Sequence, residues 1–452
     1  MGEECNSRTG RIRVFLIFLH RPQEEPGWPG SGYNYPRRIK ELTKSLKSSY
    51  PQIEFVPETV QSREKAEELL VKSKIKDIDG YLVFIIGHGT RALDIILSNC
   101  RPLILVGDLY GGSGEFLGAF SQARRDKLPM IGLTSSNFKD VVKSVHLFEV
   151  IKAMRGAKIL DILDKNTYSM AAHRDTKEYS KKLKGSFGTQ LITMTSDELN
   201  TYYKKANEKE AEKLTDKWIK EAIKVVEPSR EEIVKSAKMY LTLKQVMQDK
   251  GVDAVTIDCL GLFYAGKLAA YPCLSYFQLN NEGSTGVCEA DLDSTVTQLL
   301  MRYLTGRSGY VSDPVIDTAA NQIIYCHCVA PNKVFGPDGL SNPYIIRSHT
   351  EDHKGASVQS LMPLGEKVTT VKINVKEKAV CVHQGRTVGN VEEDKACRTK
   401  LAVELDAEKM LNNWNKKGNW GWHRVTFYGD WEKQITHLGK LLGLEVFRED
   451  IA

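Results

Sequence analysis

The first third of the chain alternates between uninterrupted apolar runs and stretches with helical periodicity. The apolar runs lie at residues 13–19, 53–56, 80–87, 101–107 and 127–133. Runs without polar alternation are typical of strands buried on both faces of a parallel sheet. The amphipathic stretches 35–49 and 62–74 lie between them and are predicted to be helices. This pattern predicts a doubly wound α/β domain over residues 1–152.

A second α/β domain is predicted over residues 153–317. Its helix starts have the spacing of capping boxes, and glycine marks a helix end; the residues are Thr195 with Glu198, Ser229 with Glu232, and Gly251. Strands are expected at 254–261 and 286–292, followed by a helix.

The pattern changes again after residue 317. Short runs rich in β-forming residues replace the helical periodicity, with turn-forming segments between them. These runs predict a β-rich C-terminal domain over residues 318–452, which ends in a short helix near 431–443. The expected fold class is therefore two doubly wound α/β domains followed by a β-rich domain.

Composition and charge narrow the class of protein. The chain has 63 Lys and Arg against 57 Asp and Glu, and a formal net charge of +6 over 452 residues is too small to indicate a nucleic-acid or membrane partner. No apolar run approaches the roughly 20 residues of a membrane span, and the first ten residues lack the core of a signal peptide. Nine scattered cysteines do not form a disulfide framework. We expect a reduced, cytoplasmic protein.

Two loops after predicted strands are candidates for ligand binding. The glycine cluster at 107–118 could cradle a phosphate, but its spacing fits neither the dinucleotide nor the Walker motif, so an ordinary strand–loop–helix turn is the better interpretation. His88 lies between two glycines at another strand end, the edge where α/β sheets usually bind ligands. It is a candidate substrate-site residue, and a structural loop histidine is an equally good reading.

Acidic residues in apolar surroundings suggest a metal site. Glu289 interrupts an apolar run, Asp291 shares its face if the strand continues, and Asp313 ends another apolar segment. Carboxylates are rarely buried unless they are paired or bound to metal. Together with histidines they suit a divalent cation such as Mn²⁺. Structural carboxylates that cap loops remain the commoner alternative.

Histidines flanked by cysteines or tryptophans supply the imidazole candidates. On a strand, Cys326 and Cys328 would face one side and His327 the other, so the cysteines are better read as packing and His327 as the functional member. Near the C-terminus, Trp422 precedes His423 in an aromatic segment. The tryptophans there could form a wall for stacking a sugar, although composition favours a core edge.

The segments 286–314 and 419–423 resemble the L-fucose/L-arabinose isomerase family, and more closely its fucose-isomerase-like branch. The first has the family's glutamate and aspartate with a helix between them that ends in Leu-Thr-Gly. The second resembles the family's Asn-Trp-Gly segment before a metal-binding histidine, although here the histidine comes one residue sooner. Weaker similarity extends over most of the chain.

The resemblance implies roles for particular residues. Glu289, Asp313 and His423 would bind the metal, and the two carboxylates would also transfer protons. His327 lies where the arabinose isomerases place a further metal-site histidine, which fucose isomerases lack. Arg21, after the first strand, resembles a substrate-contacting arginine. Trp422 departs from the fucose pattern, and the substrate is therefore open.

The activity implied is a metal-dependent aldose–ketose isomerisation, an intramolecular oxidoreduction that moves a proton between C1 and C2 of a monosaccharide through an enediol. Two carboxylates can exchange base and acid roles across these carbons, and a divalent cation stabilises the enediolate oxygens. The alternatives are a metal-dependent lyase or hydrolase on a sugar derivative, or a non-catalytic sugar-binding protein. The family also implies a homo-oligomer, a trimer or hexamer, in which Arg21 or His88 serves a neighbour's site.

Overall fold

The computed structural model describes residues 10–75, 78–98, 102–165, 167, 169 and 171–451. Cys5, Cys100 and Arg101 lie outside these ranges, and the cysteines within them are free. Contacts divide the chain into two compact units, residues 1–156 with 436–445, and residues 157–435 with 446–452. The domain boundary proposed at residue 317 falls inside the second unit and stays a prediction. Every helix in the described ranges is too short or too polar to cross a lipid bilayer.

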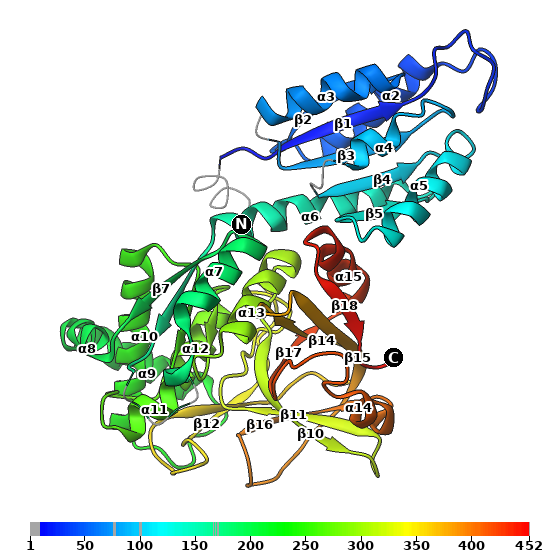
Figure 1. Cartoon of the computed structure of the whole chain (residues 1–452). Coiled ribbons are helices and arrows are strands. Elements are labelled where there is room, and N and C mark those ends of the chain that lie inside the picture. Colours follow the sequence, from blue (N-terminus) through cyan, green and yellow to red (C-terminus); the bar gives the residue numbers. More distant parts are fainter. Residues whose placement is uncertain are drawn as a thin grey trace. The chain divides into compact units, whose positions relative to one another are not determined.

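The first unit is built on a five-stranded parallel sheet (Figure 1). Its strand order is β2-β1-β3-β4-β5, and the bounds are β1 (Arg13–Leu19), β2 (Glu54–Val60), β3 (Gly80–Ile85), β4 (Leu103–Gly107) and β5 (Met130–Leu133). The continuous apolar runs of the sequence form these strands, so the predicted parallel sheet is confirmed. Their near-complete burial explains the lack of polar alternation.

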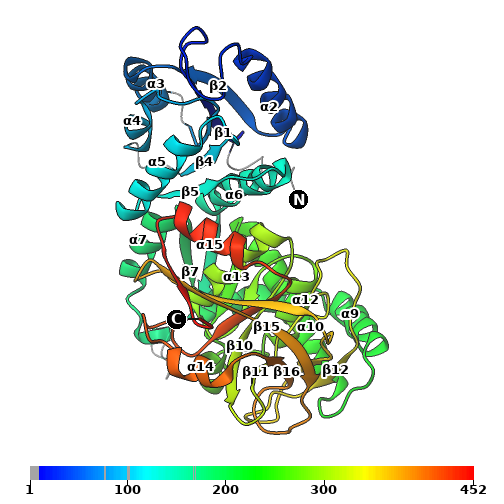
Figure 2. The ribbon, with the colours of Figure 1, turned by 90° about the vertical axis from the view of Figure 1, so that its right-hand side faces the viewer.

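Helices cover both faces of this sheet. They are α2 (Tyr35–Ser49), α3 (Arg63–Ile75), α4 (Leu93–Leu97), α5 (Ser113–Arg125) and α6 (Phe138–Gly156). Figure 2 shows α3, α4 and α5 on one side of the strands and α2 and α6 on the other. Because all five strands are parallel, the loops that follow them share one edge, where open α/β sheets bind ligands.

The second unit begins with a four-stranded parallel sheet of order β7-β6-β8-β9. Its elements are β6 (Lys158–Ile162), α7 (Thr176–Phe187), β7 (Gln190–Met194), α8 (Ser196–Lys205), α9 (Glu208–Glu221), α10 (Arg230–Lys250), β8 (Ala254–Ile257), α11 (Cys259–Tyr264), α12 (Cys273–Asn281), β9 (Gly286–Val287) and α13 (Leu292–Thr305). Thr195 forms the predicted capping box, Ser229 caps α10, and Gly251 ends that helix at φ +60°.

The predicted strand 286–292 is wrong beyond Val287. β9 ends there, the chain turns at Glu289 and Ala290, and Asp291 caps α13 by accepting the Ser294 N–H. Glu289 and Asp291 therefore do not share a strand face, because a turn and a helix start replace the extended backbone.

The C-terminal part of the second unit is β-rich, as predicted, and its strands pair in the antiparallel sense. Its elements are β10 (Tyr310–Asp317), β11 (Gln322–His327), β12 (Tyr344–Arg347), β13 (Ser357–Ser360), β14 (Lys367–Asn374), β15 (Ala379–Asn390), β16 (Thr399–Glu404), α14 (Ala407–Asn413), β17 (Arg424–Tyr428) and β18 (Glu445–Arg448). The helix α15 (Glu432–Leu441) lies between β17 and β18 in the sequence, and from residue 436 it belongs to the first unit. The strand order β14-β17-β10-β11-β16-β15 closes on itself because β14 also pairs with β15. The result is a six-stranded barrel.

A buried ion pair lies among the barrel strands. Arg424 donates to both carboxylate oxygens of Glu449, at 3.2 and 2.7 Å, and both side chains are fully buried. Glu449 also contacts His383 Nδ1 at 3.0 Å, and Trp414 lies against the guanidinium. Burial opposes ionisation of Glu449, but the charge of Arg424 outweighs it and lowers the pKa of this carboxyl to about 2.

Candidate metal centre

Glu289 is carried by a turn in an uncommon backbone conformation. Glu289 and Ala290 are both left-handed, with φ of +64° and +48°, which costs roughly 1–2 kcal/mol for each non-glycine residue. Two hydrogen bonds hold this turn. The Ala290 N–H donates to the Ile257 carbonyl at 2.8 Å, and Arg174 Nη1 donates to the Ala290 carbonyl at 2.6 Å. The position of the Glu289 carboxylate therefore depends on contacts from distant parts of the chain.

Neighbouring barrel strands supply the other candidates. β10 pairs with both β11 and β17, so Asp313 of β10 lies near His327, the last residue of β11, and His423, which precedes β17. His423 Nε2 lies 3.0 Å from Asp313 Oδ1 and 3.5 Å from Glu289 Oε2. His327 Nε2 lies 3.7 Å from Glu289 Oε1. The structure thus brings all four predicted ligand residues together, and their roles as ligands stay a prediction.

Asp291 supports the centre from behind His423. Its Oδ2 is 2.9 Å from His423 Nδ1 and accepts a hydrogen bond from Lys372 Nζ at 2.6 Å. A carboxylate beside a lysine can only accept, so Nδ1 donates a proton to Asp291 and Nε2 faces Asp313 and Glu289. This carboxylate–histidine arrangement is the usual support of metal-binding imidazoles.

The charges around His423 shift several pKa values. Burial lowers the pKa of His423, but hydrogen bonds with Asp291 and Asp313 and the charge of Glu289 outweigh it and raise this pKa to about 10. Burial likewise opposes ionisation of Asp291, yet Lys372 and His423 hold its pKa well below the usual range. The pKa of Asp313 is lowered, because contacts with His423 exceed the effect of burial. The centre therefore attracts positive charge.

A divalent cation fits this donor set. One ligand atom each from Glu289, His327 and His423 lies within 4.8 Å of the others. His327 Nε2 is buried and has no hydrogen-bond partner among the described residues. Carboxylate oxygens combined with imidazole nitrogens suit Mn²⁺ and similar ions. The three residues that meet this distance are Glu289, His327 and His423, and Asp313, 3.0 Å from His423 Nε2, stays a predicted ligand.

A backbone hydrogen bond fixes the tautomer of His327 and opposes metal coordination through Nε2. The Cys328 N–H donates to His327 Nδ1 at 2.9 Å, which leaves the ring proton of the neutral imidazole on Nε2. Coordination through Nε2 requires that proton to move to Nδ1, so this amide contact would have to be lost. His423 instead donates from Nδ1 to Asp291, so a cation would displace only the Nε2 proton and the Asp291 contact would be kept.

Two supporting residues were missed in the sequence. Lys372 is buried on β14, and a lysine between Val371 and Ile373 in a predicted strand was a usable sign of a buried charge partner. Arg174 forms an ion pair with the buried Asp161 as well as its bond to the turn. It lies in a loop with no periodicity, and its partners come from distant segments, so no pattern in the sequence identifies it.

The aromatic segment before His423 divides into a core residue and an exposed one. Trp420 is buried and stacks on Phe447 at 5.6 Å between ring centroids, as a core edge would. Trp422 is 63% exposed, and its ring lies nearly parallel to His423 at 6.1 Å. An exposed aromatic face beside the metal candidates is suited to contact with a sugar ring.

The N-terminal candidates lie in the first unit. Arg21 Nε donates to the Gly89 carbonyl at 3.3 Å, so Arg21 contacts the loop that carries the exposed His88. Glu115 of α5 holds the same loop by accepting the Gly89 N–H at 2.7 Å. Arg21 and His88 thus belong to one loop cluster at the carboxyl edge of the first sheet, and their contact with substrate stays a prediction.

Comparison with known proteins gives one clear similarity. No protein-family model matches the chain. Sulfoquinovose isomerases of Priestia aryabhattai and of Priestia megaterium are each 24% identical to it over 328 residues, which cover 68% of this chain and 67% of the relative.

Solved structures resemble the chain weakly. A solute-binding protein from Bacillus halodurans with bound myo-inositol shares 13% identity and covers 67% of this chain and 92% of its own, with a TM-score of 0.20. The transcription regulator CcpA of Lactococcus lactis shares 12%, covers 65% and 91%, and has a TM-score of 0.17. No functional conclusion follows from these scores. Over two thirds of its length, the chain is similar in sequence to sugar isomerases.

Proposed function

We propose that this protein is a metal-dependent aldose–ketose isomerase, related to the L-fucose/L-arabinose isomerase family and acting on a free monosaccharide. The observation that carries the proposal is the convergence of Glu289, Asp313 and His423 from three separate elements into one acidic, imidazole-containing site. The sequence similarity to sulfoquinovose isomerases supports the same class of reaction.

The two carboxylates differ in ways that suit a proton transfer. Glu289 is 34% exposed, whereas Asp313 is 15% exposed and contacts His423. The more accessible Glu289 takes the proton from C2 of the open-chain aldose, which leaves negative charge on O1 of the enediolate. Asp313 takes the O2 proton and passes it to O1, and Glu289 returns its proton to C1, which completes the ketose and restores both carboxylates. When bound, a divalent cation such as Mn²⁺ would stabilise negative charge on the two oxygens.

Trp422 and the relatives suggest which sugars to test. The exposed indole lies beside His423 and would contact the non-reacting carbons of a bound sugar. The relatives are named for sulfoquinovose, a sulfonated hexose. The panel should therefore contain sulfoquinovose, L-fucose and L-arabinose.

The test is isomerisation in deuterated water. The protein is incubated with Mn²⁺ and each aldose, and NMR should show ketose that carries solvent deuterium. Glu289→Gln should abolish deuterium incorporation, while the exposed Glu408→Gln, a matched control on α14, should not. Bond cleavage in place of isomerisation would indicate a lyase or hydrolase, and tight sugar binding without turnover would indicate a binding protein. Either result rejects the proposal.

We also propose that the active form is a homo-oligomer in which Arg21 and His88 complete a neighbour's site. Mixing Arg21→Ala with Glu289→Gln subunits tests this, because each is inactive alone while a mixed oligomer holds intact sites. Recovery of activity on mixing supports shared sites. A monomer in sedimentation, or no recovery in a demonstrated mixed oligomer, refutes them.

A further inference from the structure

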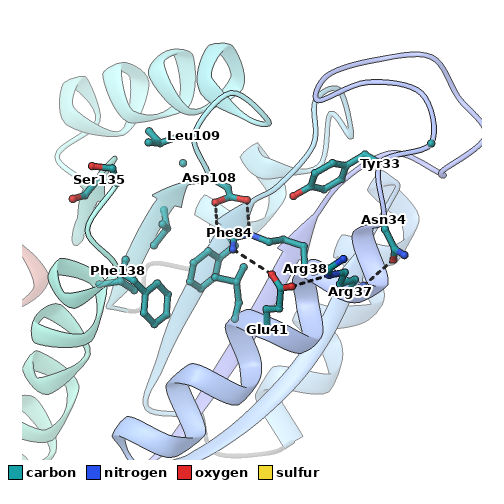
Figure 3. Close-up of a pocket in the computed structure, with 16 residues that line it drawn as sticks. Tyr33, Asn34, Arg37, Arg38, Glu41, Phe84, Asp108, Leu109, Ser135 and Phe138 are labelled. Carbon is teal, nitrogen blue, oxygen red and sulfur yellow. Dashed lines mark hydrogen bonds and ion pairs between the residues drawn. The ribbon is translucent and has the colours of Figure 1, made fainter.

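The first unit contains a cavity that the proposed isomerase chemistry does not use. It has a volume of about 700 Å³ and lies at the carboxyl edge of the parallel sheet, beside the N-terminal ends of α2 and α6 (Figure 3). Its floor is apolar and includes Phe84 of β3, Val106 of β4 and Phe138 of α6. Apolar floors with a few convergent polar groups are typical of ligand sites in open α/β sheets.

A paired arginine and aspartate form the polar wall. Arg38 Nε donates to Asp108 Oδ2 at 2.9 Å, and Arg38 Nη2 donates to Oδ1 at 2.7 Å. Asp108 directly follows β4, and its backbone N–H donates to the Ile85 carbonyl at 3.1 Å. The pair is therefore held rigidly to the sheet. Both side chains line the cavity, and their free lone pairs and N–H groups remain available to a ligand.

Other polar groups complete this wall. The Tyr33 hydroxyl is a donor at neutral pH, since a phenol ordinarily loses its proton only near pH 10, and burial and the charge of Asp108 raise the pKa of Tyr33 further. Figure 3 shows the Tyr33 ring beside Asp108. Ser136, an exposed residue in the loop after β5, also lines the cavity. The wall thus offers donors and acceptors from three different loops.

The charges that line the cavity cancel. Arg37 pairs with Glu41 at 3.0 Å, as Arg38 pairs with Asp108. An anion would meet two guanidinium groups that are already neutralised and two carboxylates that repel it. A hydroxyl group can donate to a carboxylate and accept from a guanidinium at once, and a neutral polyol satisfies both members of each pair.

We propose that this cavity binds a neutral sugar ring. Adjacent sugar hydroxyls would donate to Asp108 and accept from Arg38, and Tyr33 would donate to a ring or hydroxyl oxygen. The C–H face of the sugar ring would pack against Phe84 and Phe138. The cavity residues lie in the first unit and the metal candidates in the second, so the proposal does not depend on the proposed isomerase activity.

The test uses a sugar that cannot be isomerised. Methyl β-D-glucopyranoside is neutral and has no free carbonyl group, and saturation-transfer NMR detects binding in the millimolar range expected for a single ring. The full-length Glu289→Gln variant, treated with EDTA, serves as the background. Saturation transfer to the glycoside is expected in this variant as in the wild type, because the metal centre takes no part.

Two substitutions locate the signal. Ser136→Trp fills the cavity from an exposed position, and Asp108→Asn removes the charged acceptor; each should weaken binding by about tenfold or more. Ser49→Trp, at the far end of α2, is the matched control and should bind normally. Circular dichroism checks that each variant folds. If Asp108→Asn does not fold, Ser136→Trp alone decides.

Three results overturn the proposal. The first is absence of saturation transfer with the wild type. The second is transfer that persists in Ser136→Trp, which would place the sugar elsewhere. The third is tighter binding of D-glucose 6-phosphate than of the neutral glycoside, which would mean that the cavity selects an anion.

Discussion

Replacing Asp291 with asparagine tests how the metal candidate His423 is held. Asp291 accepts hydrogen bonds from His423 Nδ1 at 2.9 Å and from Lys372 Nζ at 2.6 Å. Asparagine keeps a side-chain oxygen and the helix cap at α13, since Asn and Asp are comparable N-caps. The substitution therefore removes the negative charge behind the imidazole with little change in shape.

The expected effect is on metal affinity more than on folding. Loss of a carboxylate that supports a metal-binding histidine typically costs 10–100-fold in affinity, or about 1.4–2.7 kcal/mol. The upper part of this range is expected here, because the Asp291 side chain is only 18% exposed and its interaction with His423 is weakly screened. Lys372 keeps Ser294 Oγ as an acceptor at 2.6 Å, which limits the loss of stability.

Isothermal titration of Mn²⁺ into metal-free protein measures the affinity. The control is Asp406→Asn, which makes the same change at the exposed N-cap of α14 and should leave Mn²⁺ affinity unchanged. Thermal unfolding of both metal-free variants shows whether the fold is intact. If Asp291→Asn binds Mn²⁺ within about twofold of wild type, the assigned support of His423 is wrong.

Three further predictions concern stability and turnover. Because the pKa of Glu449 is lowered to about 2, the ionised carboxylate stabilises the fold above pH 4.5, and this stabilisation is lost as pH falls towards 2. Glu449→Gln should lower the free energy of unfolding by on the order of 3 kcal/mol at pH 7. Urea unfolding in which the variant keeps the acid dependence of the wild type would contradict this. Arg174→Lys should lower the isomerase kcat by about tenfold or more with unchanged circular dichroism, because lysine cannot contact both Asp161 and the Ala290 carbonyl. A variant with the kcat of the wild type would refute the role of Arg174 in positioning Glu289. Mn²⁺ at one hundred times its Kd should stabilise the wild type by about 2.7 kcal/mol in calorimetry, and an equal gain in Glu289→Gln would argue against Glu289 as a ligand.

The first sheet was predictable because its signal is local. Continuous apolar runs arise when both faces of a strand are buried, and β1 and α2 have the same bounds in the sequence pattern and in the structure. The β-rich character of the C-terminal part was predictable from its short runs of β-forming residues. Closure of the barrel was not, because the pairing of β14 with both β15 and β17 depends on register between distant segments.

The candidate site was predictable in its residues and not in its construction. Glu289 stands out as a charge in an apolar run, but the run itself suggested a strand that ends five residues too late. Hydrogen bonds from Arg174 and to Ile257 impose the turn, and no local pattern encodes them. Asp291 was grouped with Glu289 as a candidate ligand, whereas the structure places it behind His423 as a helix cap.

The left-handed turn at Glu289 and Ala290 has a consequence for protein engineering. Glycine at position 290 would relieve roughly 1 kcal/mol of backbone strain. The same change would increase the conformational entropy of the unfolded chain and remove a similar amount of stability. Alanine and glycine at position 290 therefore give similar thermodynamic stability, but they differ in how rigid they make the backbone of the turn. Alanine restricts the dihedral freedom of the turn that carries Glu289, so optimisation for heat resistance alone would not detect what this methyl group contributes to the position of the carboxylate.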